Sequence, residues 1–181
     1  YQVATIYRTL LFPQRSGDIV IDAAQFEVLL RVQNRAQVRS IFDDFFNTFQ
    51  EVKKDLRISP TKINVKALPA GAPANFNGAV GQYQLQSSLS ATQVETNDAV
   101  TLKVEIYGKG NLKLVKVPEI KFPHDFDAYD PKTDNNIKVG TGGVTGSKTT
   151  EYVAIPRFGG TFESPATQFV YFDPSDARYK T

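Results

Sequence analysis

The sequence has no cysteine and only one histidine, His124. Without cysteine, this chain has no disulfide framework, no thiol nucleophile and no thiolate ligand for a metal. With one histidine, a metal site built from several imidazoles of this chain is excluded. A catalytic triad through His124 needs a serine and an acid that converge only on folding, so a solvated histidine in a turn is the simpler interpretation. We therefore expect a protein that is not an enzyme and that carries no cofactor.

Long apolar runs and concentrated charge are also missing. No stretch approaches the ~20 apolar residues that a membrane-spanning helix needs. The 21 Lys and Arg residues against 19 Asp and Glu residues give a net charge of +2, and the basic residues are spread along the chain. Binding to nucleic acid needs a concentrated basic face, so no such partner is expected. Methionine is absent and the chain opens at Tyr1, so we expect a soluble piece of a longer protein.

The sequence is rich in alternation of apolar and polar residues, which is typical of β-strands with one buried face. The clearest run is TLKVEIYG (101–108), where Leu102, Val104 and Ile106 share one face. Three further runs alternate in the same way: KINVKAL (62–68), GQYQLQSSLS (81–90) and NLKLVKVPEIKFP (111–123). The prolines of the last run restrict its later part to an edge or a turn. Many short strands separated by turn residues predict an all-β sandwich.

One segment follows a helical period instead. In SIFDDFFNTF (40–49), phenylalanines at i, i+3, i+4 and i+7 form one stripe: Phe42, Phe45, Phe46 and Phe49. Ser40 suits the N-cap, so we predict one short amphipathic helix inserted near residues 40–50. The stripe either packs on its own domain, as most amphipathic helices do, or is a docking surface for a partner. Packing is the favoured interpretation, and the four phenylalanines are the candidate partner-facing surface.

A proline- and glycine-rich stretch, LPAGAPANF (68–76), lies between two strand runs and indicates a linker. We expect residues 1–66 to be the C-terminal part of one sandwich domain, which contains the helical insertion. Residues 67–181 are expected to form a second sandwich domain.

An internal similarity supports this division. Residues 13–28 and 156–171 share proline, glycine, alanine, glutamine and phenylalanine at equivalent positions when compared without a gap. We interpret each segment as a hairpin that closes its sandwich, with Phe26 and Phe169 buried at equivalent positions. Chance similarity between two hairpins is the alternative.

A glycine-rich segment, GTGGVTGSKTTEY (140–152), has some features of a phosphate-binding loop. Ser147 separates Gly146 from Lys148, although the phosphate-loop motif needs glycine and lysine to be contiguous. The residues that follow alternate like a strand, whereas a phosphate loop precedes a helix. We predict a hairpin turn.

An acidic segment, HDFDAYDPKTDNN (124–136), has carboxylates spaced along it: Asp125, Asp127, Asp130 and Asp134. Calcium binds clustered oxygen ligands, but the glycine and the closing glutamate of an EF-hand loop are absent. We interpret the segment as a polar turn, with a calcium site as the open alternative.

Several longer strings together resemble one protein family. They are NFNGAVGQYQL (75–85), YGKGNLKLVKVPEIKFPHDFDAYDPK (107–132) and GSKTTEYVAIPRFGGTFESPATQFVYFDP (146–174), with FDDFF (42–46) and VKALP (65–69). The combination of the G-x-G-N, P-x-x-x-G and Y-F-D-P elements resembles the BatD family, the oxygen-tolerance proteins of the Bacteroides aerotolerance group.

The resemblance implies several expectations. Family members are exported, membrane-anchored proteins with tandem immunoglobulin-like β domains on the periplasmic side of the inner membrane. They are encoded beside MoxR-type AAA+ ATPases and von Willebrand factor A domain proteins, and are linked to aerotolerance or envelope stress. The chain is then an internal ectodomain fragment, with a partial first immunoglobulin-like domain. The family offers no catalytic residues to carry over.

Two functions of different classes follow. The first is a non-enzymatic interaction or scaffold module that binds other envelope proteins, namely von Willebrand factor A domain Bat-type proteins, with the MoxR-type system involved indirectly. The second is a carbohydrate-binding or adhesin-like module, which needs solvent-facing aromatics for sugar stacking. The candidates for stacking are Tyr107, Tyr129, Phe158 and Tyr171. A hydrolase on a β scaffold is the least favoured hypothesis.

Overall fold

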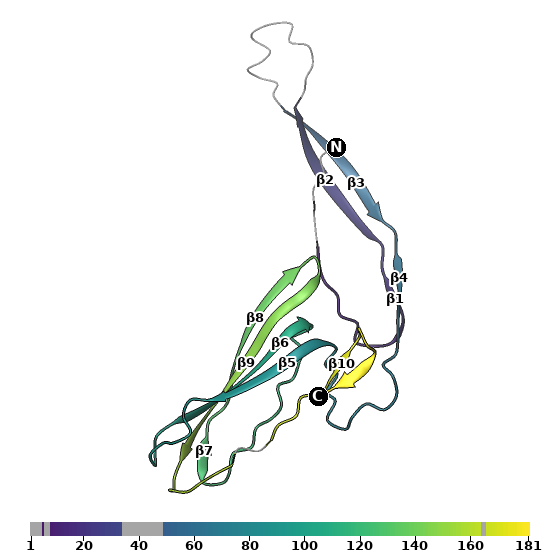
Figure 1. Cartoon of the computed structure of the whole chain (residues 1–181). Helices are drawn as coiled ribbons and strands as arrows, with labels where there is room; N and C mark the ends of the chain where they lie inside the picture. The colour runs from purple at the N-terminus through teal and green to yellow at the C-terminus, as the bar shows by residue number, and fades with distance from the viewer. Residues whose placement is uncertain (1–4, 6–7, 34–48, 164–165) are drawn as a thin grey trace, which may run out of the picture. The chain divides into compact units, whose positions relative to one another are not determined.

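The chain forms two compact units, each made of β-strands. The computed structural model describes residue 5 and residues 8–33, 49–163 and 166–181 (Figure 1). One unit is Pro13–Leu68, here called the ribbon unit, and the other comprises Tyr1–Phe12 and Pro69–Thr181, here called the sheet unit. All regular structure in the described ranges is β-strand. The predicted all-β class is therefore confirmed, and the antiparallel sheets are consistent with a sandwich-like fold.

The ribbon unit holds one antiparallel ribbon that is interrupted in the middle. β1 (Gly17–Ile21) pairs with β4 (Thr61–Val65), and β2 (Ala24–Gln33) pairs with β3 (Phe49–Ile58). The register continues without a shift from Gly17 opposite Val65 to Gln33 opposite Phe49. Pro60 lies in the interruption, where its missing N–H leaves a gap in the ladder.

The two closing hairpins expected at residues 13–28 and 156–171 are not formed. β1 and β2 follow one another along the same side of the ribbon and pair with β4 and β3, not with each other. In the second segment β9 (Gly143–Pro156) ends at Pro156, and the described residues up to 170 contain no strand. The residues that the two segments share therefore occur in different structures. Which strands pair depends on distant partner segments and not on the local turn residues.

The sheet unit is built on five antiparallel strands in the order β5–β6–β9–β7, with β8 also paired to β9. Their bounds are Gly81–Leu89 for β5, Val100–Gly110 for β6, Phe126–Ala128 for β7, Lys132–Gly140 for β8 and Gly143–Pro156 for β9. β8 pairs with the first part of β9 and β7 with its end. A small hairpin of β10 (Tyr171–Asp173) and β11 (Arg178–Lys180) is linked to the sheet by a parallel bridge between Phe172 and Val80.

The core lies on one face of this sheet. Leu102, Val104 and Ile106 of β6 are all buried, as their alternation predicts. The layer over them has little regular structure and supplies Leu112, Val115, Phe169, Val170 and Phe172. Leu85 of β5 lies opposite Ile106 and so on the core face, as its alternation predicts, but it remains 36% exposed.

The run at 111–123 was predicted to be a strand and is irregular. Its backbone carbonyls at Lys113 and Val115 accept hydrogen bonds from the side-chain amino group of Lys148, at 3.2 and 2.7 Å. In a strand, these carbonyls would accept from the backbone N–H groups of a neighbouring strand. Pro118 and Pro123 have no N–H to donate. The segment therefore contributes apolar side chains to the core without joining the sheet.

The first part of β8, residues 132–136, belongs to the acidic segment that was interpreted as a polar turn. It becomes a strand by pairing along β9, and the two are joined at Gly140 opposite Gly143. The hairpin turn predicted for the glycine-rich segment is thus confirmed. The first part of the same acidic segment, around His124, contains a turn followed by the short strand β7.

The predicted helix is found in no described residue. Phe49, its last member, is the first residue of β3. The rest of the predicted helix, with Phe42, Phe45 and Phe46, lies outside the described residues.

Candidate interaction surfaces

The ribbon formed by β2 and β3 has one apolar face. Residues directly opposite each other in an antiparallel pair lie on the same side, and alternate residues of each strand share a face. Phe26 lies opposite Leu56 and Leu30 opposite Val52, and all four side chains are exposed. We name this surface the apolar ribbon face and define it by Ala24, Phe26, Val28, Leu30, Val52, Leu56 and Ile58. Lys54, which lies opposite Val28, is the one charged residue on this side.

The opposite face of the same ribbon is charged. Arg31 Nε donates to Glu51 Oε1 at 3.0 Å, and Lys53 Nζ donates to Glu27 Oε1 at 3.0 Å. Leu29 is the one apolar side chain among the residues of β2 on this face. The ribbon is therefore amphipathic, with hydrophobic and ion-pairing residues segregated by the period of the strand.

β1 and β4 also separate apolar from polar residues, but at the opposite parity. Ile19 lies opposite Ile63 at odd-numbered positions, which carry most of the charged residues in β2 and β3, while Asp18 lies opposite Asn64 at even-numbered positions. The Asp18 carboxylate accepts from Lys62 Nζ and Asn64 Nδ2, both at 2.7 Å, and these bonds hold its pKa below the usual value. All of these ion pairs are largely exposed, so each is expected to add little to the stability of the ribbon.

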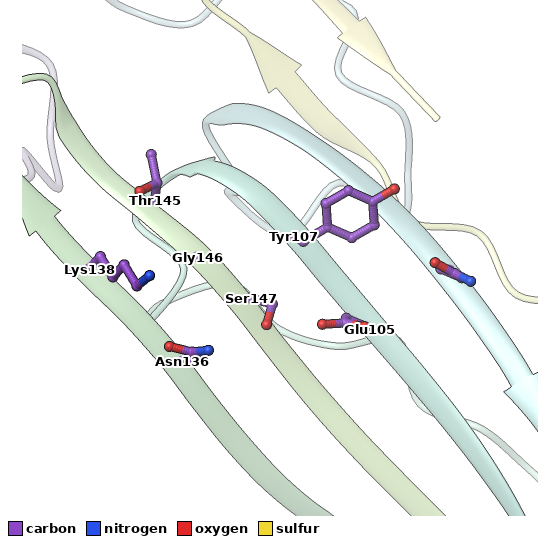
Figure 2. A pocket seen from close by; sticks show the side chains of 8 residues that line it. Glu105, Tyr107, Asn136, Lys138, Thr145, Gly146 and Ser147 are labelled. Carbon is purple, nitrogen blue, oxygen red and sulfur yellow. The ribbon is translucent and has the colours of Figure 1, made fainter.

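In the sheet unit, the face opposite the core is polar. The register aligns three rows of side chains across β5, β6, β9 and β8. They are Gln82–Lys109–Thr145–Lys138, Gln84–Tyr107–Ser147–Asn136 and Gln86–Glu105–Thr149–Asp134. A groove of about 520 Å³ runs over these strands and is lined by residues that include Glu105, Tyr107, Asn136, Lys138 and Ser147 (Figure 2). We name it the polar groove.

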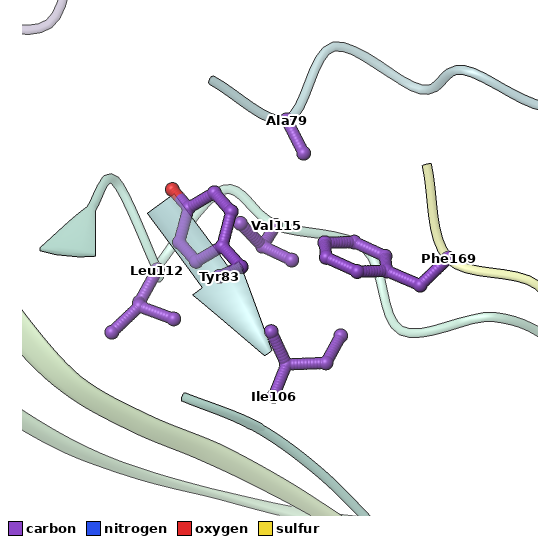
Figure 3. Close-up of a cluster of buried hydrophobic side chains, with 6 residues drawn as sticks. All are labelled: Ala79, Tyr83, Ile106, Leu112, Val115 and Phe169. Carbon is purple, nitrogen blue, oxygen red and sulfur yellow. The ribbon is translucent and has the colours of Figure 1, made fainter. Parts of the chain in front are cut away.

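On the core face, glycines make room for one tyrosine. The Tyr83 ring packs over Gly81 and Gly110, which lie opposite each other, and a Cβ at Gly81 would come 2.7 Å from the ring carbon Cζ. The hydroxyl donates to the carbonyl of Val80 at 3.0 Å, and burial raises the pKa of Tyr83 to about 12. Figure 3 shows the ring beside Phe169, which it meets edge-on at a centroid distance of 6.0 Å.

The G-x-G-N element is therefore structural in origin. Gly108 and Gly110 both have positive φ, and a Cβ at Gly108 would overlap the carbonyl oxygen of Gln82. No other residue type fits either position without moving the neighbouring strand.

The Y-F-D-P element is also structural. Asp173 is nearly buried, and its carboxylate accepts from the backbone N–H of Ser175 at 3.0 Å, from Ser175 Oγ at 2.6 Å and from Lys180 Nζ at 2.6 Å. Lys180, followed by Ser175, lowers the pKa of Asp173 well below its usual range. These bonds close the β10–β11 hairpin.

Comparison with known proteins decides the family. Residues 87–181, more than half of the chain, match the BatD DUF11 like domain. The chain belongs to the BatD family. At the family level, this supports a membrane-associated protein related to aerotolerance. No curated protein and no solved structure matches the chain.

The BatD match covers the sheet unit from within β5 to the end of the chain. It includes Gly108, Gly110, the Asp173 hairpin and the groove residues of β6, β8 and β9, while Gln86 of β5 lies just before the matched residues. The ribbon unit lies outside the matched residues. Within the described residues, there is no helix long and apolar enough to cross a membrane.

The candidates for sugar stacking separate into two groups. Tyr107 is 37% exposed and lies in the polar groove, while Tyr129 and Phe158 are more exposed and lie elsewhere. Tyr171 is half-buried, stacks on Phe169 and meets Tyr83 edge-on, so it belongs to the edge of the core.

The acidic segment does not gather its carboxylates. Asp127 pairs with Arg157, whose Nε lies 2.6 Å from Oδ2, and Asp134 lies in β8 on the polar face. Among the described residues, no group of three or more His, Cys, Asp or Glu side chains is placed to hold a metal ion. His124 is exposed in a turn.

Of the predicted partner-facing phenylalanines, Phe42, Phe45 and Phe46 lie outside the described residues, as does the side chain of Phe49. The apolar ribbon face was missed, although its signal is in the sequence. Apolar residues recur at every second position of AQFEVLLRVQ (24–33), and Val52, Leu56 and Ile58 of FQEVKKDLRI (49–58) lie opposite apolar residues of that strand.

Proposed function

We propose that this chain is a non-enzymatic interaction and scaffold module of a membrane-anchored BatD protein. It works on the periplasmic side of the inner membrane, where it binds other envelope proteins in a role linked to aerotolerance or envelope stress. The observation that carries the proposal is the apolar ribbon face, a row of exposed apolar side chains backed by a charged face.

Two strands alone are a marginal structure in water, because a ribbon buries little of its own surface. A ribbon with one apolar face gains stability when that face is covered by another sheet or a partner chain. The charged face is suited to remain in contact with water, because its exposed ion pairs are already solvated and need no partner chain. The two faces therefore favour docking through the apolar ribbon face alone.

The partner that we propose is a von Willebrand factor A domain protein of the Bat type, as the family resemblance implies. The MoxR-type ATPase takes part indirectly. The four phenylalanines at positions 42, 45, 46 and 49 stay a separate hypothesis for a partner-facing surface.

Leu29 and Leu30 offer a matched pair for the test. They are neighbours in β2, they are 57% and 43% exposed, and they lie on opposite faces of the ribbon. A photo-crosslinking amino acid is placed at position 30, or at position 29, of the intact parent protein in its native envelope, and the attached peptides are identified by mass spectrometry.

Position 30 is expected to capture a von Willebrand factor A domain protein that position 29 does not capture. Leu30→Glu is then expected to abolish co-purification of that protein, while Leu29→Glu preserves it. Equal capture from both positions, or capture only of the parent chain itself, would reject the proposed function.

A further inference from the structure

The middle row of the polar face carries no formal charge. It consists of Gln84, Tyr107, Ser147 and Asn136, one from each of four adjacent strands. It therefore offers two carboxamides and two hydroxyls, all of which both donate and accept hydrogen bonds.

The flanking rows carry opposite charges. Lys109 and Lys138 lie on one side of the middle row, and Glu105 and Asp134 lie on the other. The two lysines and two carboxylates cancel, so the face attracts neither polyanions nor polycations as a whole. Each flanking charge still offers a strong hydrogen bond to a neutral hydroxyl group.

Tyr107 is the aromatic residue of this middle row. Its hydroxyl donates to Gln84 Oε1 at 2.6 Å, which fixes the ring on the surface, and the side chain is 37% exposed. Figure 2 shows it projecting from β6 with Glu105, across from Ser147 on β9. A held aromatic ring with polar groups around it suits a ligand that is apolar on one face and hydroxylated at its rim.

We infer that the polar groove binds an extended, neutral, β-1,4-linked oligosaccharide that lies across the strands, with one sugar ring on Tyr107. Neighbouring strands are about 4.8 Å apart. This is close to the advance of one pyranose unit along an extended glycan, so successive sugars meet successive members of the middle row. The ring faces of such sugars carry C–H groups that pack on Tyr107, while their hydroxyls point to the amides and to Glu105.

This inference is independent of the proposed function, because it concerns the sheet unit and not the ribbon. A basic patch would be needed for a nucleic acid or an acidic polymer, and the cancelled charges do not supply one. An apolar surface would be needed for a helix or a sheet of another protein, and this face supplies a single aromatic ring.

The test is an NMR titration of the ¹⁵N-labelled 181-residue chain with cellohexaose and, separately, chitohexaose, at concentrations up to the millimolar range. Both are extended β-1,4-linked probes, and maltohexaose, whose α-1,4 linkages curl the chain, is the comparison. Amide shifts are expected at Gln84, Tyr107, Ser147 and Asn136 with at least one of the extended probes, and weaker or no shifts with maltohexaose.

The key variant is Tyr107→Ala, with Tyr129→Ala as the matched control. Tyr129 is a more exposed tyrosine outside the groove, so its loss is expected to leave binding unchanged. Loss of the stacking ring is expected to weaken binding about tenfold, which corresponds to about 1.4 kcal/mol. Tyr107→Phe keeps the ring and is expected to restore most of the affinity.

Four outcomes would overturn the inference. They are no shift with either extended probe, shifts that cluster away from both the groove and the middle row, equal binding of maltohexaose, and Tyr107→Ala binding like the unmodified chain. A folded spectrum for each variant shows that a lost signal reflects the site and not unfolding. Leu30→Glu changes only the ribbon, so this variant is expected to bind the glycan as the unmodified chain does, even if it no longer binds the partner protein. The two proposals can therefore fail independently.

Discussion

Asp173 shows how a single residue of a recognisable motif serves the fold. Its carboxylate forms an ion pair with the ammonium of Lys180 and accepts two hydrogen bonds from Ser175, and the residue is almost fully buried. The ion pair lowers the pKa of Asp173 and raises that of Lys180, so the charged forms of both are favoured in the folded hairpin. The aspartate of the Y-F-D-P element thus holds β10 and β11 together.

A dependence of stability on pH follows from this lowered pKa. A carboxyl group whose pKa is lower in the folded state stabilises the fold above its unfolded pKa of about 3.9, and this contribution is lost as pH falls further. We expect Asp173→Asn to remove this part of the acid sensitivity, and to lower stability at neutral pH because the amide cannot pair with the Lys180 charge. Urea unfolding followed from pH 7 to pH 2 measures both effects.

The charge-matched control is Asp130→Asn, which removes a carboxylate from an exposed loop. If the free energy of unfolding falls by the same amount between pH 7 and pH 2 in Asp173→Asn and in the unmodified chain, Asp173 does not stabilise the fold in this way.

At the scale of the element, the sheet unit depends on segments that are not strands. The irregular run at 111–123 and the stretch before β10 cover the buried face of the sheet, and they place Leu112, Val115 and Phe169 in one cluster with Tyr83 and Ile106. Phe169 also stacks on Tyr171 at a centroid distance of 5.8 Å. Phe169 therefore links the covering layer to the sheet.

Phe169→Ala is expected to cost about 3–5 kcal/mol in the free energy of unfolding, because it removes a buried ring and leaves a cavity. Phe158→Ala is the control, since Phe158 is mostly exposed and its truncation is expected to change stability by less than about 0.5 kcal/mol. Chemical denaturation gives both values. A cost below about 1 kcal/mol for Phe169→Ala would mean that the covering layer contributes little to the core.

At the scale of the whole molecule, the chain passes between the two units first between Phe12 and Pro13 and again between Leu68 and Pro69. Residues 66–75 around the second crossing are all exposed and belong to no strand. Exposed segments rich in proline and glycine are where proteases cut and where insertions are tolerated. A cut between Leu68 and Pro69 therefore frees residues 69–181 from the ribbon unit, which stays joined to residues 1–12.

We expect a protease site inserted between Leu68 and Pro69 to be cut rapidly under native conditions. After cutting, hydrogen exchange at the amides of β6 and β9 is expected to stay as slow as in the intact chain, because the core of the sheet unit is formed within residues 69–181. Exchange that accelerates throughout β6 and β9 after the cut would show that the sheet unit needs the ribbon unit to stay folded.

The sequence by itself determined the class of the fold and several of its strands. Alternation placed β6 and its buried residues correctly, the paired glycines placed the β8–β9 turn, and distinctive strings identified the BatD family. These features are local: a strand with one buried face repeats every two residues, and a tight turn needs particular residues at fixed positions. Both can therefore be recognised without knowing the partner strand.

Only the tertiary structure decided which strands pair and which surfaces remain open. β1 pairs with β4 across more than forty residues, the polar strand β8 forms because β9 offers it a ladder, and the run at 111–123 leaves the sheet to cover it. Each of these outcomes depends on interactions between residues far apart in the chain. The free energy of these interactions outweighs the local preference of each segment for a strand or a turn. The polar groove and the apolar ribbon face exist for the same reason, since each is made by neighbouring strands in one register.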